Sequence, residues 1–175
     1  MRKIILDTET TGIHPEEGHR IVEIAAIEFN GKGASSSRRL HYLFNPEREV
    51  DYGAAEVHGL TWSRLKYEPR FAEKADEIAE FIRDSELIMH NAPFDVGFLN
   101  AGFERVGIPE VRIVSSIITD TLELARSRHP YEKNGLHSLC QRYGVDTVGR
   151  TSHGALLDAE LLSEVYQNMH LKALH

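Results

Sequence analysis

Short apolar runs with strand character occupy the first quarter of the chain and are separated by polar turns. They lie at residues 3–7 (KIILD), 21–29 (IVEIAAIEF) and 38–44 (RRLHYLF). The run at 21–29 alternates imperfectly between apolar and polar positions, which predicts a half-buried strand. The turn-rich stretch 30–37 (NGKGASSS) has the composition of a hairpin connector. We therefore predict three strands that form an antiparallel meander.

After Pro69 the apolar positions change to helical spacing. Phe71, Ala75, Ile78 and Ile82 recur as on one face of a helix, and a proline is favoured where a helix begins. Further helices are predicted at 93–107, 121–128, 136–143 and 155–170, and further strands at 86–91 and 112–120. Because strands alternate with helices in this half, part of the sheet is expected to be parallel, and the fold class is α/β.

Acidic residues follow the predicted strands or begin the predicted helices. Asp7 and Glu9 end the first strand, and side chains two residues apart on an extended chain point to the same face. Asp95 lies in the first turn of the helix after the fourth strand, for which Asn91 is the expected N-cap. Asp158 lies just inside the last helix. Ligands of α/β sheets bind beyond the carboxyl ends of the strands, so we expect these carboxylates to converge on one edge.

Such a cluster is unfavourable by itself, because like charges repel and desolvation penalises each of them. It becomes favourable around Mg²⁺ or Mn²⁺, which prefer oxygen ligands. Two such ions, roughly 3.5–4 Å apart, can stabilise the attacking and the leaving oxygens of a phosphodiester displacement. His153, in the loop before the last helix, is placed to remove a proton near neutral pH. The residues therefore predict metal-dependent phosphodiester hydrolysis.

The composition limits the kinds of partner and the cellular compartment that we expect. The formal net charge of −7 argues against a protein that holds nucleic acid by bulk electrostatics, although bound cations would offset part of it. The one cysteine, Cys140, cannot form an intramolecular disulfide and is expected in the core of a protein from a reducing compartment. The apolar runs are all shorter than the roughly 18 residues of a membrane span, and the first strand leaves no room for a signal peptide. A cytoplasmic protein without membrane contact is expected.

Three motifs resemble those of the DEDDh family of 3′–5′ exonucleases, and among them the epsilon-type proofreading subunits of bacterial DNA polymerase III. They are DTETTG at 7–12, HNAPFD at 90–95 and SHGALLD at 152–158. Supporting segments are RIVEIAAIE at 20–28, VHGL at 57–60, ITDTLELAR at 118–126 and LCQRYGVD at 139–146. The resemblance extends from residue 3 to about residue 169. It implies a ribonuclease-H-like fold with a mixed five-stranded sheet of order 3-2-1-4-5 flanked by helices.

The resemblance also implies an activity and a set of roles. The activity is removal of nucleotides one at a time from the 3′ end of DNA, with release of nucleoside 5′-monophosphates. By the family pattern, Asp7 bridges two divalent cations, Mg²⁺ or Mn²⁺, and Glu9 and Asp158 complete their binding. Asp95 holds the second ion through water, and His153 is the general base.

Substrate contacts are implied less sharply. Thr8 would line the pocket, His58 would approach the 3′ terminus, and Asn91 would support the motif around the second-ion ligand. Related sequences often carry a glutamate shortly before VHG, but Glu56 is not obviously in that register. Asp120 either caps the following helix or touches a metal. These last two roles stay open at the level of sequence.

The organisation and the partners follow from the same resemblance. Residues 1–170 are expected to form one exonuclease domain, with 171–175 a linker or an expression remnant. Partners would be a DNA 3′ terminus, the alpha subunit of DNA polymerase III through a C-terminal tail that nothing here matches, and a small accessory subunit. Two alternatives remain: an exoribonuclease or oligonucleotidase that resembles ribonuclease T or oligoribonuclease, and an inactive scaffold or nucleic-acid-binding module.

Overall fold

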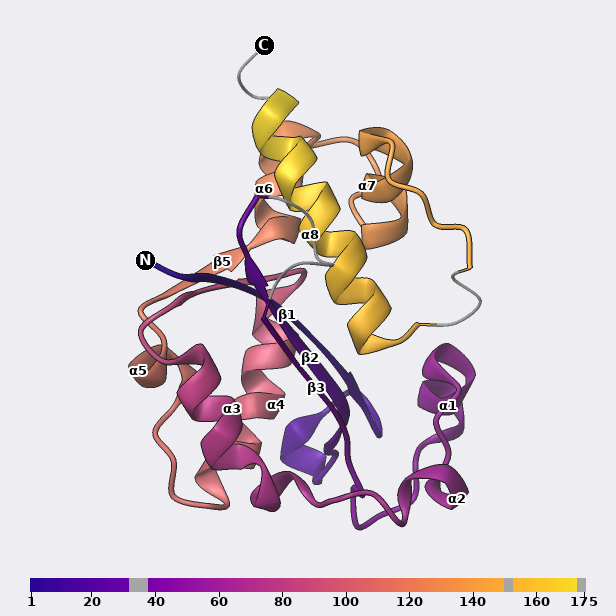
Figure 1. Cartoon of the computed structure of the whole chain (residues 1–175). Coiled ribbons are helices and arrows are strands. Elements are labelled where there is room, and N and C mark those ends of the chain that lie inside the picture. The colour runs from indigo at the N-terminus through magenta and orange to yellow at the C-terminus, as the bar shows by residue number, and fades with distance from the viewer. Residues whose placement is uncertain (32–37, 150–152, 173–175) are drawn as a thin grey trace.

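The computed structural model describes residues 1–31, 38–149 and 153–172, and its centre is a mixed five-stranded sheet (Figure 1). The strands are β1 (Lys3–Thr10), β2 (Ile21–Phe29), β3 (Arg39–Leu43), β4 (Glu86–Met89) and β5 (Ile117–Asp120). Their order is β3-β2-β1-β4-β5; the first three strands are antiparallel, whereas β4 and β5 continue the sheet in parallel with β1. The predicted meander and strand order are confirmed. Most of the predicted connector at 30–37 lies outside the described residues.

Helices cover both faces of the sheet. They are η1 (Pro15–Glu17), α1 (Tyr52–His58), α2 (Trp62–Leu65), η3 (Phe71–Glu73), α3 (Ala75–Ile82), α4 (Ala92–Glu104), α5 (Val111–Val114), α6 (Thr121–Arg128), α7 (Leu136–Tyr143) and α8 (Ala155–Lys172). Figure 1 shows α3 and α4 on one face and α8 across the other. The larger apolar core joins the sheet to α3, α4 and α5, and a second one joins Ile5, Ala25 and Ile27 to α8.

Strand β2 is more buried than predicted, because helices cover both faces of the sheet. Its first seven residues, 21–27, are all buried, so the strand is covered on both faces and not half-buried as predicted. The imperfect alternation of its sequence reflects this double cover, because both faces of the strand need apolar side chains. One polar residue, Glu23, interrupts the apolar run and is buried with it.

Two further predictions are corrected at the level of single elements. The β-branched segment 112–120 was expected to be one strand, but Val111–Val114 form the short helix α5 and only Ile117–Asp120 pair with β4. Val111 and Val114 are buried in the larger core, and burial outweighs their β propensity. The helix predicted from Phe71 begins as the 3₁₀ turn η3 and becomes α-helical at Ala75.

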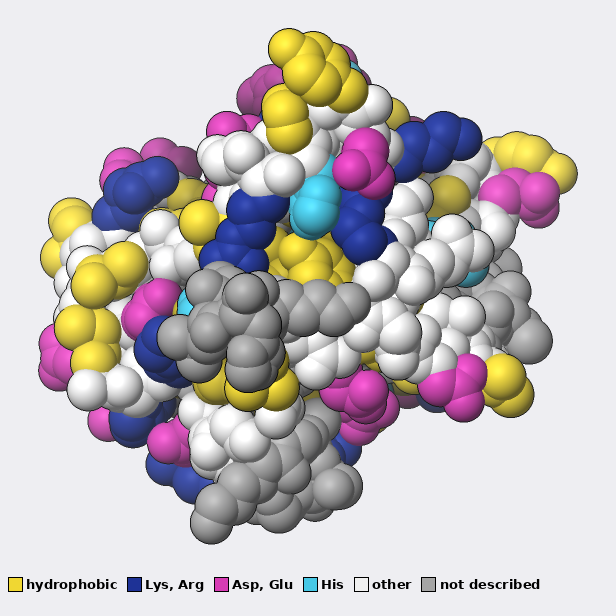
Figure 2. Space-filling view, turned by 90° about the horizontal axis from the view of Figure 1, so that it is seen from above, with side chains coloured by type: hydrophobic (Ala, Val, Ile, Leu, Met, Phe, Trp, Pro, Cys, Tyr) yellow, Lys and Arg dark blue, Asp and Glu magenta, His cyan; other side chains and the backbone are white. Residues whose placement is uncertain are grey.

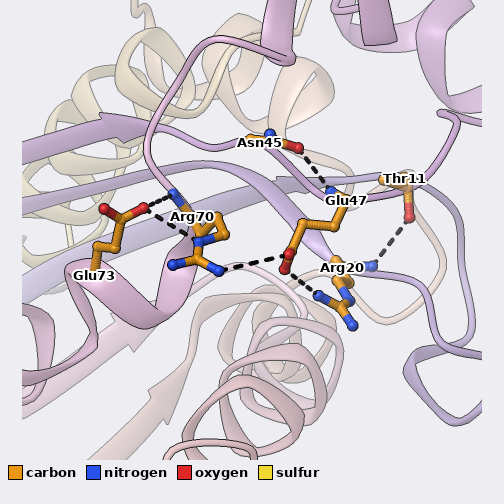
Figure 3. A network of polar contacts seen from close by, with 6 residues as sticks. All are labelled: Thr11, Arg20, Asn45, Glu47, Arg70 and Glu73. Atoms are coloured by element: carbon orange, nitrogen blue, oxygen red, sulfur yellow. Dashed lines mark hydrogen bonds and ion pairs between the residues drawn. The ribbon is translucent and has the colours of Figure 1, made fainter.

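The segment from 45 to 70 contains two short helices, α1 and α2, that no periodicity predicted. Figure 3 shows how its beginning and end are tied to the start of β2. The carboxylate of Glu47, a residue with a left-handed φ of 55°, lies 2.8 Å from Arg20 and 3.9 Å from Arg70. Asn45 accepts a hydrogen bond from the backbone N–H of Glu47 at 2.8 Å, and Arg70 also pairs with Glu73. Polar contacts with distant parts of the chain, instead of a regular pattern, fix this loop.

Helix α1 lies at the carboxyl end of β1. The backbone N–H of Asp51, just before the helix, donates to the carbonyl of Thr11 at 2.9 Å. At the other end of α1, Nε2 of His58 donates to the carbonyl of Thr10, also at 2.9 Å. The helix therefore borders the edge of the sheet where the acidic residues were expected.

Candidate active site

The first two acidic residues project from the end of β1 toward α8. Asp7 and Glu9 share a face with Ile5, which packs against α8, because alternate residues of a strand point the same way. In the antiparallel register, Asp7 lies opposite Ala25 and Glu9 lies opposite Glu23 on β2. The pairing shifts between Glu9 and Thr10, where the strand leaves the sheet. Two carboxylates are thereby placed at the edge of the sheet.

Asp95 reaches the same edge from the first turn of α4. Its side chain is only 3% exposed. Oδ1 of Asp95 accepts hydrogen bonds from the hydroxyl of Thr8 at 2.6 Å and from the backbone N–H of Thr8 at 3.1 Å. The middle of the DTETTG motif is thus attached directly to the end of the HNAPFD motif.

The remaining members come from α8 and the loop before it. Asp158 is buried in the first turn of α8, and its Oδ2 accepts a hydrogen bond of 2.9 Å from Nδ1 of His153. The backbone N–H of His153 donates to the carbonyl of Val57 in α1 at 3.0 Å. Ligand atoms of Glu9, His153 and Asp158 all lie within 4.8 Å of one another. The predicted cluster is assembled from three segments that are far apart in the sequence.

The electrostatics of the cluster are those of carboxylates without enough counter-charge. Burial raises the pKa of Asp7 well above its ordinary value, and repulsion from Asp95, Glu9 and Asp158 raises it further. Burial likewise raises the pKa of Asp95 to about 7, although the two hydrogen bonds from Thr8 oppose the shift. A cation among these oxygens would remove the repulsion, and an oxygen-rich donor set suits Mg²⁺ or Mn²⁺. The residues present therefore fit hard divalent cations.

The residues predicted to contact substrate have well-defined partners within the protein. His58 is buried, and besides its bond to Thr10 its Nδ1 accepts from the N–H of Leu60 at 3.0 Å. Burial lowers the pKa of His58, so the ring is neutral and braces the loop. Thr8 is buried and bonded to Asp95, and Glu56 is exposed on α1. Contacts of Thr8, His58 and Asn91 with substrate stay predictions.

Asn91 and Asp120 act together at the start of α4. Asn91 is the N-cap residue of α4, as predicted, and has a left-handed φ of 69°, but its side chain makes no capping hydrogen bond. Instead its backbone N–H donates to Oδ1 of Asp120 at 3.0 Å. The same oxygen accepts from the N–H of Leu122 at 2.9 Å, so Asp120 caps α6. Of the two roles left open for Asp120, the structure supports the cap.

Glu23 is a residue near the site that sequence reasoning missed. Its carboxylate accepts hydrogen bonds from Nε2 of His41 at 2.8 Å and from the backbone N–H of Ala155 at 3.0 Å. The available signal was a single acid inside an apolar run, on the same strand face as Ala25 and Ile27. That pattern indicates a buried carboxylate but does not identify its partners.

A sheet of order 3-2-1-4-5 with a carboxylate cluster at the end of its central strand defines an α/β nuclease domain of ribonuclease-H-like fold. Solved structures have the same architecture. Exonuclease X in complex with 5′-overhanging duplex DNA matches with a TM-score of 0.71 and 23% identity, over 99% of this chain and 93% of that one. The zinc-bound E. coli ExoI–ssDNA complex matches with a TM-score of 0.80 and 18% identity, over 99% of this chain and 41% of that one.

Sequence comparison identifies the family. The pattern that defines the Exonuclease family, RNase_T, matches residues 4–166. DNA polymerase III subunit epsilon of Rickettsia felis is 49% identical over 167 residues, which are 95% of this chain and 72% of that protein. The Escherichia coli subunit is 43% identical over 174 residues, 96% of this chain and 71% of that protein. The chain belongs to the Exonuclease family and, within it, to the DNA polymerase III epsilon subunits, as the resemblance implied.

Proposed function

We propose that the protein is a proofreading exonuclease that hydrolyses phosphodiester bonds from the 3′ end of DNA and releases nucleoside 5′-monophosphates. The observation that carries this proposal is the convergence of Asp7, Glu9, Asp95 and Asp158 with His153 at one edge of the sheet. The names of the relatives, which are subunits of a DNA polymerase, support DNA as the substrate.

The four carboxylates would hold two divalent cations, Mg²⁺ or Mn²⁺. When bound, such ions lower the pKa of a water molecule and stabilise the attacking and leaving oxygens of the displacement. Asp7, at the centre of the mutual repulsion, would bridge the two ions, with Glu9 and Asp158 completing their binding. Asp95, held by Thr8, would serve the second ion through water.

His153 is assigned as the general base. Its side chain is 49% exposed on the rim of the cluster, where a water molecule can reach it. His153 itself is held from two sides: its backbone N–H donates to the carbonyl of Val57 in α1, and its Nδ1 donates to Asp158 of α8. In this position the imidazole accepts the proton of the attacking water as the bond to phosphorus forms.

The acidic net charge favours a substrate held by its end over one held along a duplex. On the face in Figure 2, Lys and Arg side chains are interspersed with acidic and hydrophobic ones, and the side chains described there form no broad basic area. With a net charge of −7, firm attachment to DNA would come from a partner. We infer that this partner is the polymerase alpha subunit, joined by a small accessory subunit, in the cytoplasm. No helix among the described residues is long and apolar enough to cross a bilayer.

Residues 1–170 are proposed to act as one exonuclease domain, followed by a linker. The test incubates purified protein with 5′-labelled single-stranded DNA, or with RNA of matching sequence, with Mg²⁺, with Mn²⁺, or with EDTA. Asp7→Ala and His153→Ala are compared with His137→Ala, which removes an exposed histidine on α7 far from the cluster in sequence.

A ladder that shortens from the 3′ end of DNA, needs metal, and persists only in wild type and His137→Ala is the expected result. Faster digestion of RNA would reassign the protein to the ribonuclease T or oligoribonuclease type. Failure of the folded, metal-supplied protein to digest either substrate would leave only a scaffold or binding module.

A further inference from the structure

Glu23 is a buried carboxylate beside the site whose purpose the proposed reaction does not explain. It is 7% exposed and lies on the face of β2 that packs against α8. Burial of an acid is costly unless hydrogen bonds or opposite charges replace its water. Its retention in an otherwise apolar strand calls for a reason.

Both oxygens of Glu23 are engaged by groups from other elements. Oε1 accepts from Nε2 of His41 on β3 at 2.8 Å, and Oε2 accepts from the backbone N–H of Ala155, the first residue of α8, at 3.0 Å. Burial alone would raise the pKa of Glu23, but these bonds and the N–H of Leu156 outweigh it and hold the pKa below its ordinary value. The side chain is therefore ionised at neutral pH and caps α8 from the sheet.

This cap acts on the turn that carries two members of the cluster. Asp158 lies in the first turn of α8, and its backbone N–H donates to the carbonyl of Gly154 at 2.9 Å. His153 directly precedes that turn and is bonded to Asp158. In the register of the sheet, Glu23 lies opposite Glu9, so the two acids face the same space. The carboxylate of Glu23 is directed at the backbone of α8, whereas Glu9 belongs to the cluster.

We propose that Glu23 is a positioning residue of the active site: it docks the first turn of α8 on β2, and thereby sets the places of Asp158 and His153 relative to Asp7 and Glu9. The proposal rests on the proposed nuclease function. The proposed role is geometric, because Glu23 accepts a hydrogen bond from the backbone of α8. The pairing of β1 with β2 fixes Glu23 relative to Asp7 and Glu9. The hydrogen bond from Ala155 then fixes the start of α8 relative to Glu23.

Two substitutions of Glu23 distinguish the effect of its hydrogen bonds from the effect of its charge. In Glu23→Gln, the amide oxygen can still accept from Ala155, and the NH₂ group can donate to His41, so the docking is kept while the charge is lost. Glu23→Ala removes both bonds. Glu160→Ala is the matched control, because Glu160 also joins α8 to the sheet, through a 2.9 Å ion pair with Arg39, but does not touch the first turn.

We would measure kcat and KM on single-stranded DNA, and the Mn²⁺ affinity from a titration with the metal alone, all well below the melting temperature of each variant. The melting temperature is determined separately. In Glu23→Ala we expect kcat to fall by about 10–100-fold with KM within about threefold, and Mn²⁺ affinity to fall by about tenfold. Glu23→Gln should recover both quantities to within about threefold of wild type, and Glu160→Ala should match wild type.

Three outcomes would overturn the proposal. Wild-type kcat and Mn²⁺ affinity in Glu23→Ala would show that the contact only stabilises the fold. Equal losses in Glu23→Gln would assign the effect to charge, and equal losses in Glu160→Ala would assign it to any contact of α8. If Glu23→Ala does not fold, Glu23→Asp, which withdraws the carboxylate from the helix, replaces it and must lower Mn²⁺ affinity. If wild type cuts no DNA, the proposed function fails, while the Mn²⁺ titration still decides the role of Glu23.

Discussion

Replacing Asp95 by asparagine should stabilise the metal-free protein while it impairs metal binding. The substitution keeps the shape of the side chain and an oxygen that can accept from Thr8, but removes a buried charge. The pKa of Asp95 is raised from 3.8 to about 7. At about 1.4 kcal/mol per pH unit, ionisation of this group costs the folded state about 4 kcal/mol. Because Asp7 and Asp95 repel each other, this cost belongs to the pair, and Asp7→Asn should give a similar gain that does not add to the first.

The pH dependence has a definite sign. Asp95 ionises near 3.8 in the unfolded chain and near 7 in the folded protein, so the folded state binds the proton more tightly. Its contribution therefore lowers the free energy of unfolding as the pH rises from about 4 to about 7, and is constant at higher pH. The advantage of Asp95→Asn over wild type should be absent near pH 4, grow through this window, and reach its full value by about pH 8.

The assay is thermal unfolding in EDTA at several pH values, repeated with Mn²⁺. For a chain of this size, about 4 kcal/mol corresponds to a rise of roughly 8–16 °C in melting temperature at pH 8, an upper limit because the surroundings relax. With Mn²⁺ the order should reverse, since wild type keeps all four carboxylates and gains more binding energy than the variant. Glu164→Gln, an exposed acid on α8, is the control and should stay within about 0.5 kcal/mol of wild type. An Asp95→Asn protein no more stable than wild type in EDTA at pH 8 would refute the cost assigned to ionising the buried Asp95 carboxylate.

Two predictions concern the scaffold. A Cβ on Gly102 of α4 would lie 2.6 Å from the ring of Phe71, so Gly102→Ala should cost about 1–3 kcal/mol in a denaturant titration; in the same helix Gly97→Ala meets no close atom and should be neutral or stabilising, and equal behaviour of the two would contradict the packing. Asp120→Ala, which removes the cap of α6, should lower the free energy of unfolding by about 1–2 kcal/mol, whereas Asp120→Asn should restore most of it; a melting temperature unchanged by the alanine would disprove the cap.

The sequence was sufficient for the parts of the fold that local pattern determines. The run at 21–29 matches β2 at both ends, and the helices at 121–128 and 136–143 match α6 and α7. The convergence of Asp7 and Asp95 was also predictable, because both lie at strand ends of one sheet edge. The segment 112–120 was not, because burial of Val111 and Val114 decides between helix and strand there.

Contacts between distant residues mark the limit of sequence reasoning. The bond from Ala155 to Glu23 spans 132 positions, and the bonds from Thr8 to Asp95 span 87. Neither residue type nor spacing predicts such a partner, since a threonine or an acid within a strand can form many different contacts. The motifs therefore located the clustered carboxylates, while the groups that hold these carboxylates in place emerged only from the fold.

The members of the cluster lie far apart in the sequence and are therefore synthesised at different times. Asp7 and Glu9 leave the ribosome early, whereas His153 and Asp158 follow only after the whole sheet has been synthesised. Until α8 docks on β1 and β2, a nascent or truncated chain lacks two members of the cluster, His153 and Asp158. The cluster can therefore be complete only after α8 has been synthesised and docked, and we predict that a protein that has lost α8 to proteolysis is unable to cut DNA.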